Sequence, residues 1–475
     1  MNDSVAGASV AGTAELPRPS ARKRVFNLAW PVIGESFLET MLMIVDTWMV
    51  AQLSTAAIAG VGASVQVLFF IIAALGALSV GSSVLVAQAY GAGKLGEAAR
   101  LARQSIAWSI ILSLPLAVIG FFLAGPVIAL FGVEADVARI GKEYLQVTMA
   151  TVVVLIVLMI GGGALRGLGD SQTPMRVTAL ANFVNVFLTY GLIFGVAGLP
   201  ALGAVGSAWG TFLSRLLAAA ILVIVMWRGR KGVSISGRSN WLPEIGVASS
   251  VLRIGVPAAL EQLLTSAGFT SMTAIVATLG TAALASHRIA FNILSLSFLP
   301  GFGFAIAATA LVGQSVGARE PEEGAEAAAI ATRWAVAWMA AMGVVSYLLA
   351  EPIIRLFSQE AAVVRDGVAA IQVVALAQPF WAVLFVQSGA LRGMGNTGFP
   401  LRANTAGIWS TMIIAWLAVN YLDGGISHVW GVFLITSPVM AIVLWKRFRR
   451  AVSEWSEQVE DGSQHFGQTD VAVSQ

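Results

Sequence analysis

Three carboxylates lie within one apolar stretch near the start of the chain, PVIGESFLETMLMIVDTWMV at residues 31–50. Glu39 and Asp46 follow Glu35 by 4 and 11 residues. In an α-helix this spacing places all three within about 40° of one face, on a stripe roughly 16 Å long. A carboxylate at the depth of a lipid bilayer costs at least about 2.5 kcal/mol, so its presence indicates a function. Such a stripe suits the binding of a proton, a cation or the cationic group of a ligand.

Asp46 is the most deeply placed of the three, because the apolar residues MLMIV precede it and WMV follows shortly after it. We interpret Asp46 as the group that binds a proton or a coupling cation; the alternative is a structural acid satisfied by its neighbours. Glu35 lies nearer the helix end and is either an interfacial group or part of the same site. We assign Glu35, Glu39 and Asp46 to the binding of a cationic substrate.

A second polar face is formed by Asn182, Asn185 and Thr189, which are spaced 3 and 4 residues apart in another apolar stretch. These side chains either share the ion-coupling site of Asp46, with Na⁺ held between Asp46 and Asn185, or hydrogen-bond between helices, as Asn and Thr do in membranes. The residues alone leave both interpretations open.

The later part of the chain offers Glu261, His287 and Asn292 in apolar surroundings. We expect Glu261 and His287 to contribute to ion coupling, and Glu261 and Asn292 to bind substrate. His287 is either a group that titrates near neutral pH or a neutral partner of a backbone carbonyl. Arg288 lies on the same helix face as Asn292 and is expected to pair with Glu261.

Trp381 and Phe385 are four residues apart and can share a helix face. Aromatic side chains of this kind supply the apolar walls that a cationic drug needs beside a carboxylate. They predict a central cavity that is lined by Asp46 and Glu261 from opposite halves of the chain. The alternative is that these aromatic side chains face lipid or fill the bundle.

Membrane-spanning helices must position these side chains. The 475 residues are 57% hydrophobic and 11% charged, against about 25% charged in a soluble chain. Apolar runs of about 20 residues, the length that crosses a bilayer, recur along the sequence. The chain is therefore an all-α polytopic membrane protein. Twelve transmembrane helices are predicted at 28–52, 58–90, 104–124, 143–165, 177–197, 204–227, 251–278, 282–316, 331–350, 367–390, 403–421 and 429–446.

The Lys and Arg residues orient these helices. Loops on one side of the membrane carry 22 of them, and loops on the other side carry 4. The positive-inside rule then places both termini in the cytoplasm, which is consistent with an even number of spans. We expect a multi-pass protein of the inner (plasma) membrane.

Several classes of function are excluded by what the sequence lacks. The absence of cysteine excludes disulfides, thiolate metal sites and cysteine nucleophiles. A net charge of +3 is too small to predict nucleic-acid binding. The stretch GAGKLG at 91–96 is not a phosphate loop, because no strand precedes it, so no ATP hydrolysis is expected. Hydrolase and metalloprotease motifs are also missing, so we expect neither an enzyme nor a cofactor.

The chain contains an internal repeat in which position n matches position n + 226. GALRGLGDSQTP at 163–174 and GALRGMGNTGFP at 389–400 match at seven of twelve positions. Residues 31–60 match 257–286 at 11 of 30 positions. Each GALRG copy is interpreted as the cytoplasmic loop between the fourth and fifth spans of a six-helix half. Because six is even, the halves are parallel repeats related by an axis along the membrane normal.

The repeat predicts the organisation of the chain. Parallel halves favour alternating access by rocking about a site between them; the alternative is a duplicated structural bundle without transport. The predicted segments are a cytoplasmic tail at 1–24, a six-helix half at 25–227, a cytoplasmic linker at 228–250, a second six-helix half at 251–450 and a disordered tail at 451–475.

With twelve spans, two halves and these motifs, the chain resembles the multidrug and toxic compound extrusion (MATE) family. The resemblance rests on PVIGESFLETMLMIVDTWMVAQL, on ALASHRIAFNILSLSFLPGFGFAIAATALVGQSVGA and on the two GALRG copies, and the eighth span looks most like the DNA-damage-inducible branch. It implies a secondary active antiporter that exports cationic, amphipathic compounds in exchange for H⁺ or Na⁺. The implied partners are small organic cations and the lipid bilayer, and we expect a monomer.

Two positions depart from the family pattern. That branch commonly carries Asn-x-x-x-Asp in the fifth span, whereas Thr189 follows Asn185 here, and the other branch has an Asp at the position of Trp381. Asp46 and Glu261 therefore remain as coupling candidates. The rival functions are a channel and a lipid-linked intermediate flippase of the wider superfamily. A flippase usually has a strongly cationic cavity, and the arginines within these spans are Arg215 and Arg288.

Overall fold

The computed structural model describes residues 19–237 and 241–461, which form helices, connecting loops and one isolated β-bridge between Arg230 and Val233. The helices of the N-terminal half are α1 (Ala21–Ala51), α2 (Thr55–Gly91), α3 (Leu95–Ala129), α4 (Ala135–Ala150), α5 (Val152–Gly167), α6 (Gln172–Phe194) and α7 (Ala204–Arg228). Those of the C-terminal half are α8 (Ile245–Ala277), α9 (Thr281–Ala318), α10 (Pro321–Leu348), α11 (Ala350–Phe357), α12 (Ala361–Gly393), α13 (Gly398–Tyr421), α14 (Ile426–Gly431) and α15 (Phe433–Glu460).

These helices form twelve membrane spans. Within the described ranges, 10 helices are long and apolar enough to cross a membrane if α14 and α15 count as one, and α4 with α5 forms a further span bent by 51°. Helix α13 is not among these apolar helices, but its 24 residues reach about 36 Å at about 1.5 Å per residue, enough to cross a bilayer, and it is the counterpart of the span α6 in the repeat. Each of the twelve ranges predicted from the sequence coincides with one span. The predicted all-α fold of twelve transmembrane helices is confirmed.

The sequence does not predict the bend between α4 and α5. Thr151 stands at the break, and its hydroxyl donates to the carbonyls of Val147 at 2.9 Å and Thr148 at 3.3 Å. A threonine that bonds back to the preceding turn bends a helix. Thr148 and Thr151 both line the cavity described below, so the bend lies beside it.

Both predicted tails are too long. Helix α1 begins at Ala21, inside the predicted tail of 1–24. Helix α15 continues to Glu460, so the prediction of disorder from residue 451 onward is wrong for 451–460. The physical reason is Trp455, which is 1% exposed and lies against Gly324 at the start of α10, so that folding buries a large apolar ring. The remaining tail residues, 1–18 and 462–475, lie outside the described ranges.

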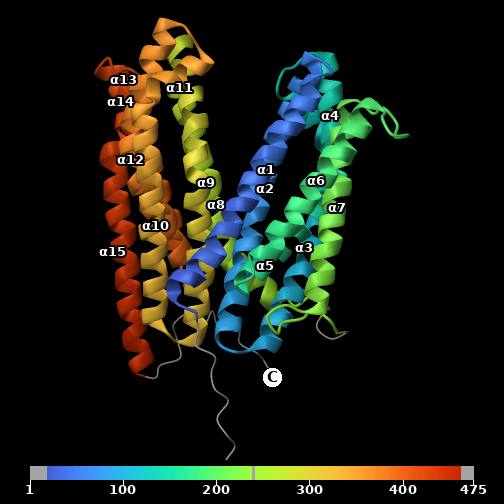
Figure 1. Ribbon diagram of the computed structural model, residues 1–475, viewed down its shortest axis with the longest axis vertical. Coiled ribbons are helices and arrows are strands. Elements are labelled where there is room, and N and C mark those ends of the chain that lie inside the picture. The colour runs from blue at the N-terminus through green and yellow to red at the C-terminus, as the bar shows by residue number, and fades with distance from the viewer. Residues whose placement is uncertain (1–18, 238–240, 462–475) are drawn as a thin grey trace, which may run out of the picture.

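The two halves meet at one end and diverge at the other (Figure 1). Helices α1–α7 form one bundle and α8–α15 form the other, and α2 contacts α8 and α9 between them. The start of α1, the end of α15 and the turns after α2, α5, α9 and α12 all lie where the halves meet, which we call the closed end (Figure 1).

Each half has its own hydrophobic core, and the first helix of each half begins in the core of the other. Val25 and Leu28 of α1 belong to the core that α9, α10 and α12 form in the C-terminal half. Val251 and Ile254 of α8 are their counterparts in the repeat and belong to the core of the N-terminal half. This exchange of apolar side chains fastens the halves together at the closed end.

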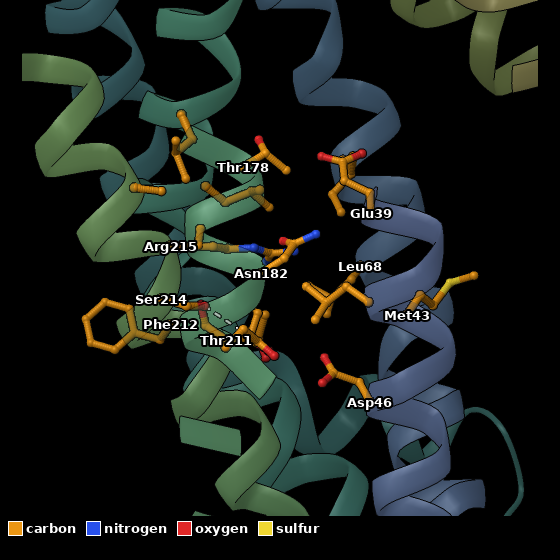
Figure 2. A pocket seen from close by; sticks show the side chains of 18 of the residues that line it. Glu39, Met43, Asp46, Leu68, Thr178, Asn182, Thr211, Phe212, Ser214 and Arg215 are labelled. Carbon is orange, nitrogen blue, oxygen red and sulfur yellow. Dashed lines mark hydrogen bonds between the residues drawn. The ribbon is translucent and has the colours of Figure 1, made fainter. Parts of the chain in front are cut away.

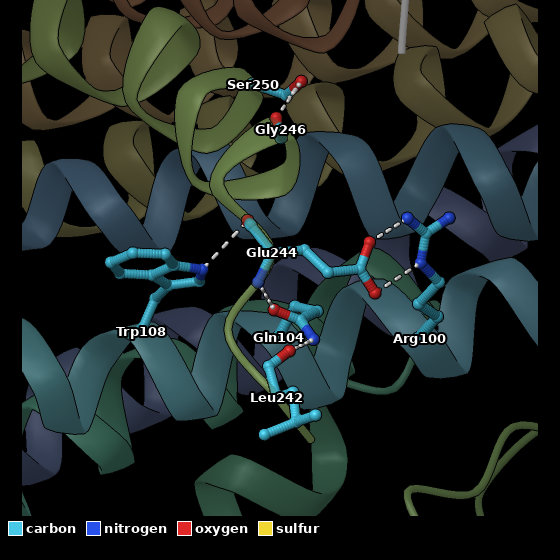
Figure 3. Close-up of polar contacts among 7 residues, drawn as sticks. All are labelled: Arg100, Gln104, Trp108, Leu242, Glu244, Gly246 and Ser250. Atoms are coloured by element: carbon cyan, nitrogen blue, oxygen red, sulfur yellow. Dashed lines mark hydrogen bonds and ion pairs between the residues drawn. The ribbon is translucent and has the colours of Figure 1, made fainter. Parts of the chain in front are cut away.

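The linker between the halves is fixed to α3 (Figure 3). The Gln104 side chain accepts the backbone N–H of Glu244 at 2.9 Å and donates to the carbonyl of Leu242 at 2.7 Å, and Trp108 donates to the carbonyl of Glu244 at 3.1 Å. Arg100 donates to both carboxylate oxygens of Glu244, and these hydrogen bonds hold the pKa of Glu244 below its usual value. Helix α8 begins at the next residue, Ile245, so the observed linker is shorter than the predicted linker of 228–250.

Candidate functional site

A cavity of about 670 Å³ lies inside the N-terminal half. Its walls come from α1, α2, α4, α5, α6 and α7, and Ile306 of α9 is the one lining residue from the described part of the C-terminal half. The volume falls in the range of about 300–1,000 Å³ that is typical of ligand pockets. The polar and charged lining residues are Glu35, Ser36, Glu39, Asp46, Thr47, Tyr144, Thr148, Thr151, Arg166, Thr178, Asn182, Asn185, Ser207, Thr211, Ser214 and Arg215.

The carboxylate stripe of α1 faces this cavity. Glu35, Glu39 and Asp46 all line it, since their spacing keeps them on one side of an unbroken helix. Figure 2 shows Glu39 and Asp46 pointing from α1 toward the opposite wall. One carboxylate oxygen of Asp46 is buried and has no hydrogen-bond partner among the described residues. A buried acceptor in this state can take up a proton or a cation.

Glu35 is already paired. Its carboxylate accepts hydrogen bonds from Arg166 at 3.1 Å and from the Thr178 hydroxyl at 3.3 Å. Arg166 belongs to the first GALRG copy. This copy was predicted to be a loop, but it forms the C-terminal end of helix α5. The chain reverses just after it, at Gly169, whose φ is +81°. Arg166 therefore offsets the charge of Glu35, and the charge of the stripe that remains belongs to Glu39 and Asp46.

The polar residues of α6 connect helices. Asn182 donates to a backbone carbonyl of α1 at 2.9 Å. Asn185 is 0% exposed and donates to the hydroxyls of Thr211 and Ser214 on α7 at 3.2 Å each, while its oxygen accepts from Thr189 at 3.2 Å. These contacts fit the interpretation as hydrogen bonds between helices. Asn182 and Asn185 also line the cavity, whereas Thr189 does not. A share of these residues in ion coupling stays a prediction.

The candidates from the C-terminal half do not line the cavity. Glu261 is 5% exposed, and its carboxylate accepts from Arg392 and Asn404 at 2.6 Å each. The expected pair of Glu261 with Arg288 is therefore wrong. Glu261 and Arg392 are the counterparts of Glu35 and Arg166 in the repeat, so this ion pair occurs in both halves.

The other C-terminal candidates are also placed elsewhere. His287 is buried, with Nε2 3.1 Å from the Thr273 hydroxyl and its ring against Trp430, and Asn292 is exposed outside the cavity. The cavity that the structure shows thus contains Asp46 without Glu261, Trp381 or Phe385. The expected roles of Glu261 and His287 in ion coupling, and of Glu261, Asn292, Trp381 and Phe385 in substrate binding, stay predictions.

Aromatic packing explains the difference. Trp381 is 5% exposed and packs edge-on against Phe298 with ring centroids 5.2 Å apart. Phe385 stacks on Phe302 with centroids 4.5 Å apart. Trp381 therefore fills the interior of the C-terminal half, and Phe385 is half-buried beside it, which agrees with the alternative interpretation from the sequence that these rings fill the bundle.

Arg215 of α7 is a lining residue to which the spacing arguments assign no role. It points into the cavity toward Asn182 (Figure 2). The sequence marks Arg215 in the same way as Asp46, because each is a charged residue inside an apolar stretch. Tyr144 and Ser207 also line the cavity, but single hydroxyl groups in a span give no comparable signal.

The closed end is held by two reciprocal hydrogen bonds. Gln88 of α2 donates to the carbonyl of Gly393 at 3.0 Å, and Gln314 of α9 donates to the carbonyl of Gly167 at 2.8 Å. Gln314 and Gly393 are the counterparts of Gln88 and Gly167 in the repeat. Each half therefore binds the second glycine of the other half's GALRG copy, and we call these contacts the reciprocal glutamine bonds. A Cβ at Gly91 would overlap the backbone of Gln314, so the helices approach closely here.

Comparison with known proteins identifies one family and one fold. The MatE family model matches residues 31–191 and 257–417. The chain is similar to the probable multidrug resistance protein NorM of Thermotoga maritima, with 34% identity over 420 residues that cover 87% of this chain and 89% of that protein. It is also similar to the uncharacterized transporter YisQ of Bacillus subtilis, with 26% identity over 90% of this chain and 94% of that protein.

Solved structures show the same fold. A crystal structure of MATE in the bent conformation matches with a TM-score of 0.87 at 24% identity, covering 93% of this chain and 98% of that chain. A MOP superfamily transporter from Pyrococcus furiosus matches with a TM-score of 0.85 at 24% identity, covering 92% of this chain and 97% of that chain.

Proposed function

Because the chain belongs to the multidrug and toxic compound extrusion (MATE) family, whose members are transporters and not enzymes, we propose that it exports cationic and amphipathic organic compounds in exchange for H⁺ or Na⁺. The observation that carries this proposal is the cavity of the N-terminal half, where Glu39 and Asp46 face a largely apolar lining. Carboxylates beside apolar walls suit a cation with an apolar body. The related NorM protein is named for multidrug resistance, which supports the same substrate class.

We place the closed end in the cytoplasm of a plasma-membrane protein. The loops at this end belong to the side that carries 22 Lys and Arg residues against 4 on the other. Since the halves diverge at the opposite end (Figure 1), this conformation faces outward, with the path from the cytoplasm closed. Both termini are then cytoplasmic, and the protein works as a monomer.

Alternating access requires the closed end to open. The reciprocal glutamine bonds break, and the exchanged starts of α1 and α8 separate from the opposite cores. The cytoplasm then reaches the end of the cavity where Glu35 and Arg166 lie. Each hydrogen bond contributes about 1 kcal/mol, so the binding of substrate or ion can shift this equilibrium.

Asp46 couples the two fluxes. A proton or Na⁺ that enters from outside neutralises Asp46 and weakens its attraction for a cationic substrate, which then leaves outward. Thr189 stands where one branch of the family carries a second carboxylate, so Asp46 has no carboxylate partner on α6. A single carboxylate favours H⁺ over Na⁺, because protonation neutralises it completely.

The test is transport into proteoliposomes that contain the full-length protein. We expect an acid interior to drive concentrative uptake of the lipophilic cation tetraphenylphosphonium, and a protonophore to abolish the uptake. A Na⁺ gradient at constant pH serves as the second driving force, and protein-free vesicles serve as the control. Uptake with Na⁺ alone would reverse the choice of ion, whereas no uptake with either gradient would contradict the proposed function.

A further inference from the structure

Arg215 is a charged group of the cavity that the exchange of a cation for H⁺ or Na⁺ does not use. Its guanidinium points from α7 toward Asn182 and faces the α1 wall at a level between Glu39 and Asp46 (Figure 2). Among the residues that the structure describes, no ion pair joins Arg215 to a carboxylate. A guanidinium in this position is available to a ligand.

The charges of the cavity restrict what that ligand can be. Glu35 and Arg166 offset each other, which leaves Glu39 and Asp46 on one wall and Arg215 on the other. A charge at membrane depth is costly, and it marks a substrate or ion path when it faces a cavity. The planar guanidinium binds a carboxylate through two parallel hydrogen bonds.

The repeat indicates that the fold itself does not need Arg215. The arginines of the two GALRG copies are counterparts, and each is used in an ion pair at the closed end. The sixth span of each half contains a WGxFL motif, at 209–213 and at 430–434. The offset here is 221 and not 226, and this alignment makes Thr436 the counterpart of Arg215. The C-terminal half, which has the same fold, has a small neutral residue at this position.

We propose that Arg215 makes the cavity selective for zwitterionic substrates, which carry a basic group and a carboxylate on one apolar body. The basic group lies against Glu39 and Asp46, and the carboxylate binds the guanidinium. This inference rests on the proposed export function and names the substrate class of the same cavity. An anion without a basic group is repelled by the two carboxylates, and a simple cation leaves Arg215 unpaired, which costs binding energy.

A competing role for Arg215 is that of a fixed counter-charge for Asp46 without contact to the substrate. In that role its removal changes the affinity for all cationic substrates alike. In the role proposed here its removal weakens the binding only of compounds with a carboxylate. Two ligands that differ in the carboxylate alone therefore separate the two roles.

Rhodamine 110, a zwitterion, and rhodamine 123, its cationic methyl ester, form such a pair. Binding to the purified full-length protein is measured by fluorescence anisotropy for the wild type, Arg215→Gln and Arg215→Lys. We expect the wild type to bind rhodamine 110 more tightly than rhodamine 123. Arg215→Gln weakens the binding of rhodamine 110 by about tenfold or more, and it leaves the binding of rhodamine 123 unchanged or makes it tighter. Arg215→Lys keeps the charge but loses the planar fork, so it gives an intermediate loss.

The outcomes distinguish this inference from the function on which it rests. Equal weakening of both dyes in Arg215→Gln, or a wild type without preference for rhodamine 110, overturns the inference and leaves the export function in place. If the wild type neither binds nor transports any organic cation, the export function fails and this inference fails with it. If Arg215→Gln does not fold, Arg215→Lys decides, and an unchanged ratio of the two affinities overturns the inference.

Discussion

The two halves have the same fold but differ in what fills their centres. In the N-terminal half, Leu155 and Met159 of α5 line the cavity. Their counterparts in the repeat are Trp381 and Phe385 of α12, which pack against other aromatic rings. Larger side chains thus occupy in the C-terminal half the volume that forms the cavity in the N-terminal half.

The polar groups of the cavity differ between the halves in the same way. Asp46 corresponds to Met272, and Asn182 corresponds to Ile408. Met272 and Ile408 are both buried in the core of the C-terminal half. In this packed interior apolar residues stand in place of the polar ones, because an unpaired buried polar group would be costly.

The contacts that both halves share lie at the closed end. They include the ion pairs of Glu35 and Glu261 with the arginines of the GALRG copies, and the reciprocal bonds of Gln88 and Gln314. Repeated residues therefore form the ion pairs within each half and the hydrogen bonds between the halves, whereas Asp46 and Asn182, which are polar in one half only, line the cavity. Variants at corresponding positions of the two halves test this distinction.

The largest effect is expected for Asp46→Asn. The amide can neither bind a proton in exchange nor carry the charge that attracts a cation, so gradient-driven transport should fall to the level of protein-free vesicles. The matched control is Met272→Leu, a volume-conserving change at the corresponding position, which should leave transport within about twofold. Normal concentrative transport by a well-folded Asp46→Asn protein would remove Asp46 from the coupling mechanism.

Glu261→Gln is expected to act on stability and not on substrate choice. It leaves Arg392 without its carboxylate in a mostly buried position, which costs about 2 kcal/mol. The apparent Tm of the detergent-solubilised protein should fall, and transport of matched cationic and neutral compounds should decrease equally. A selective loss for the cationic compound would give Glu261 a direct role in binding.

Gln88→Ala and Gln314→Ala each remove one of the reciprocal glutamine bonds, and Gln314→Ala also removes a longer hydrogen bond of 3.5 Å from Arg24, so we expect similar effects of the two variants. Losing about 1 kcal/mol from the closed state should raise the population of the inward-open state about fivefold in either variant. Because the chain has no cysteine, a single Ser36→Cys in the cavity can report access from the cytoplasm through its labelling rate with an impermeant maleimide. Clearly unequal rates for the two variants would show that the two bonds do not act as a symmetric pair.

The comparison of the halves also explains what could be predicted from the sequence. Spans, and a charge such as Asp46 inside a span, are local signals, and the spacing on α1 fixed the face that lines the cavity. The partner of Glu261 lies 131 residues away at Arg392, and no periodicity selects it over Arg288. The orientation of Trp381 is decided by rings from other helices. The sizes of Trp381 and Leu155 at corresponding positions are a signal that the repeat alone could have supplied.

The smallest expected effect concerns the turns that follow the two GALRG copies. Asp170 accepts the backbone N–H of Thr173 at 3.0 Å, and its counterpart Asn396 accepts the backbone N–H of Phe399 at 3.3 Å. Asp170 alone has an ion pair, with Arg230 at 2.8 Å. Burial raises the pKa of Asp170, but the hydrogen bonds from Thr173 and Arg230 outweigh it and hold the pKa below the usual 3.8. The same turn is thus built with a charge in one half and without one in the other.

Asp170→Asn gives the first turn the side chain that the second turn already has. Since the pKa is lowered in the folded state, the ionised form stabilises the protein above about pH 3.8, and this contribution is lost as the pH falls below that value. Arg230 is 45% exposed, so solvent screening limits the expected loss of stability at pH 7 to about 1 kcal/mol. Thermal unfolding at pH 7 and at pH 3 should show a larger difference between wild type and variant at the higher pH. Asn396→Ala is the control, because the loss of stability that it causes should not depend on pH. A difference for Asp170→Asn that stays constant across this range would mean that hydrogen-bond geometry, and not charge, stabilises the turn.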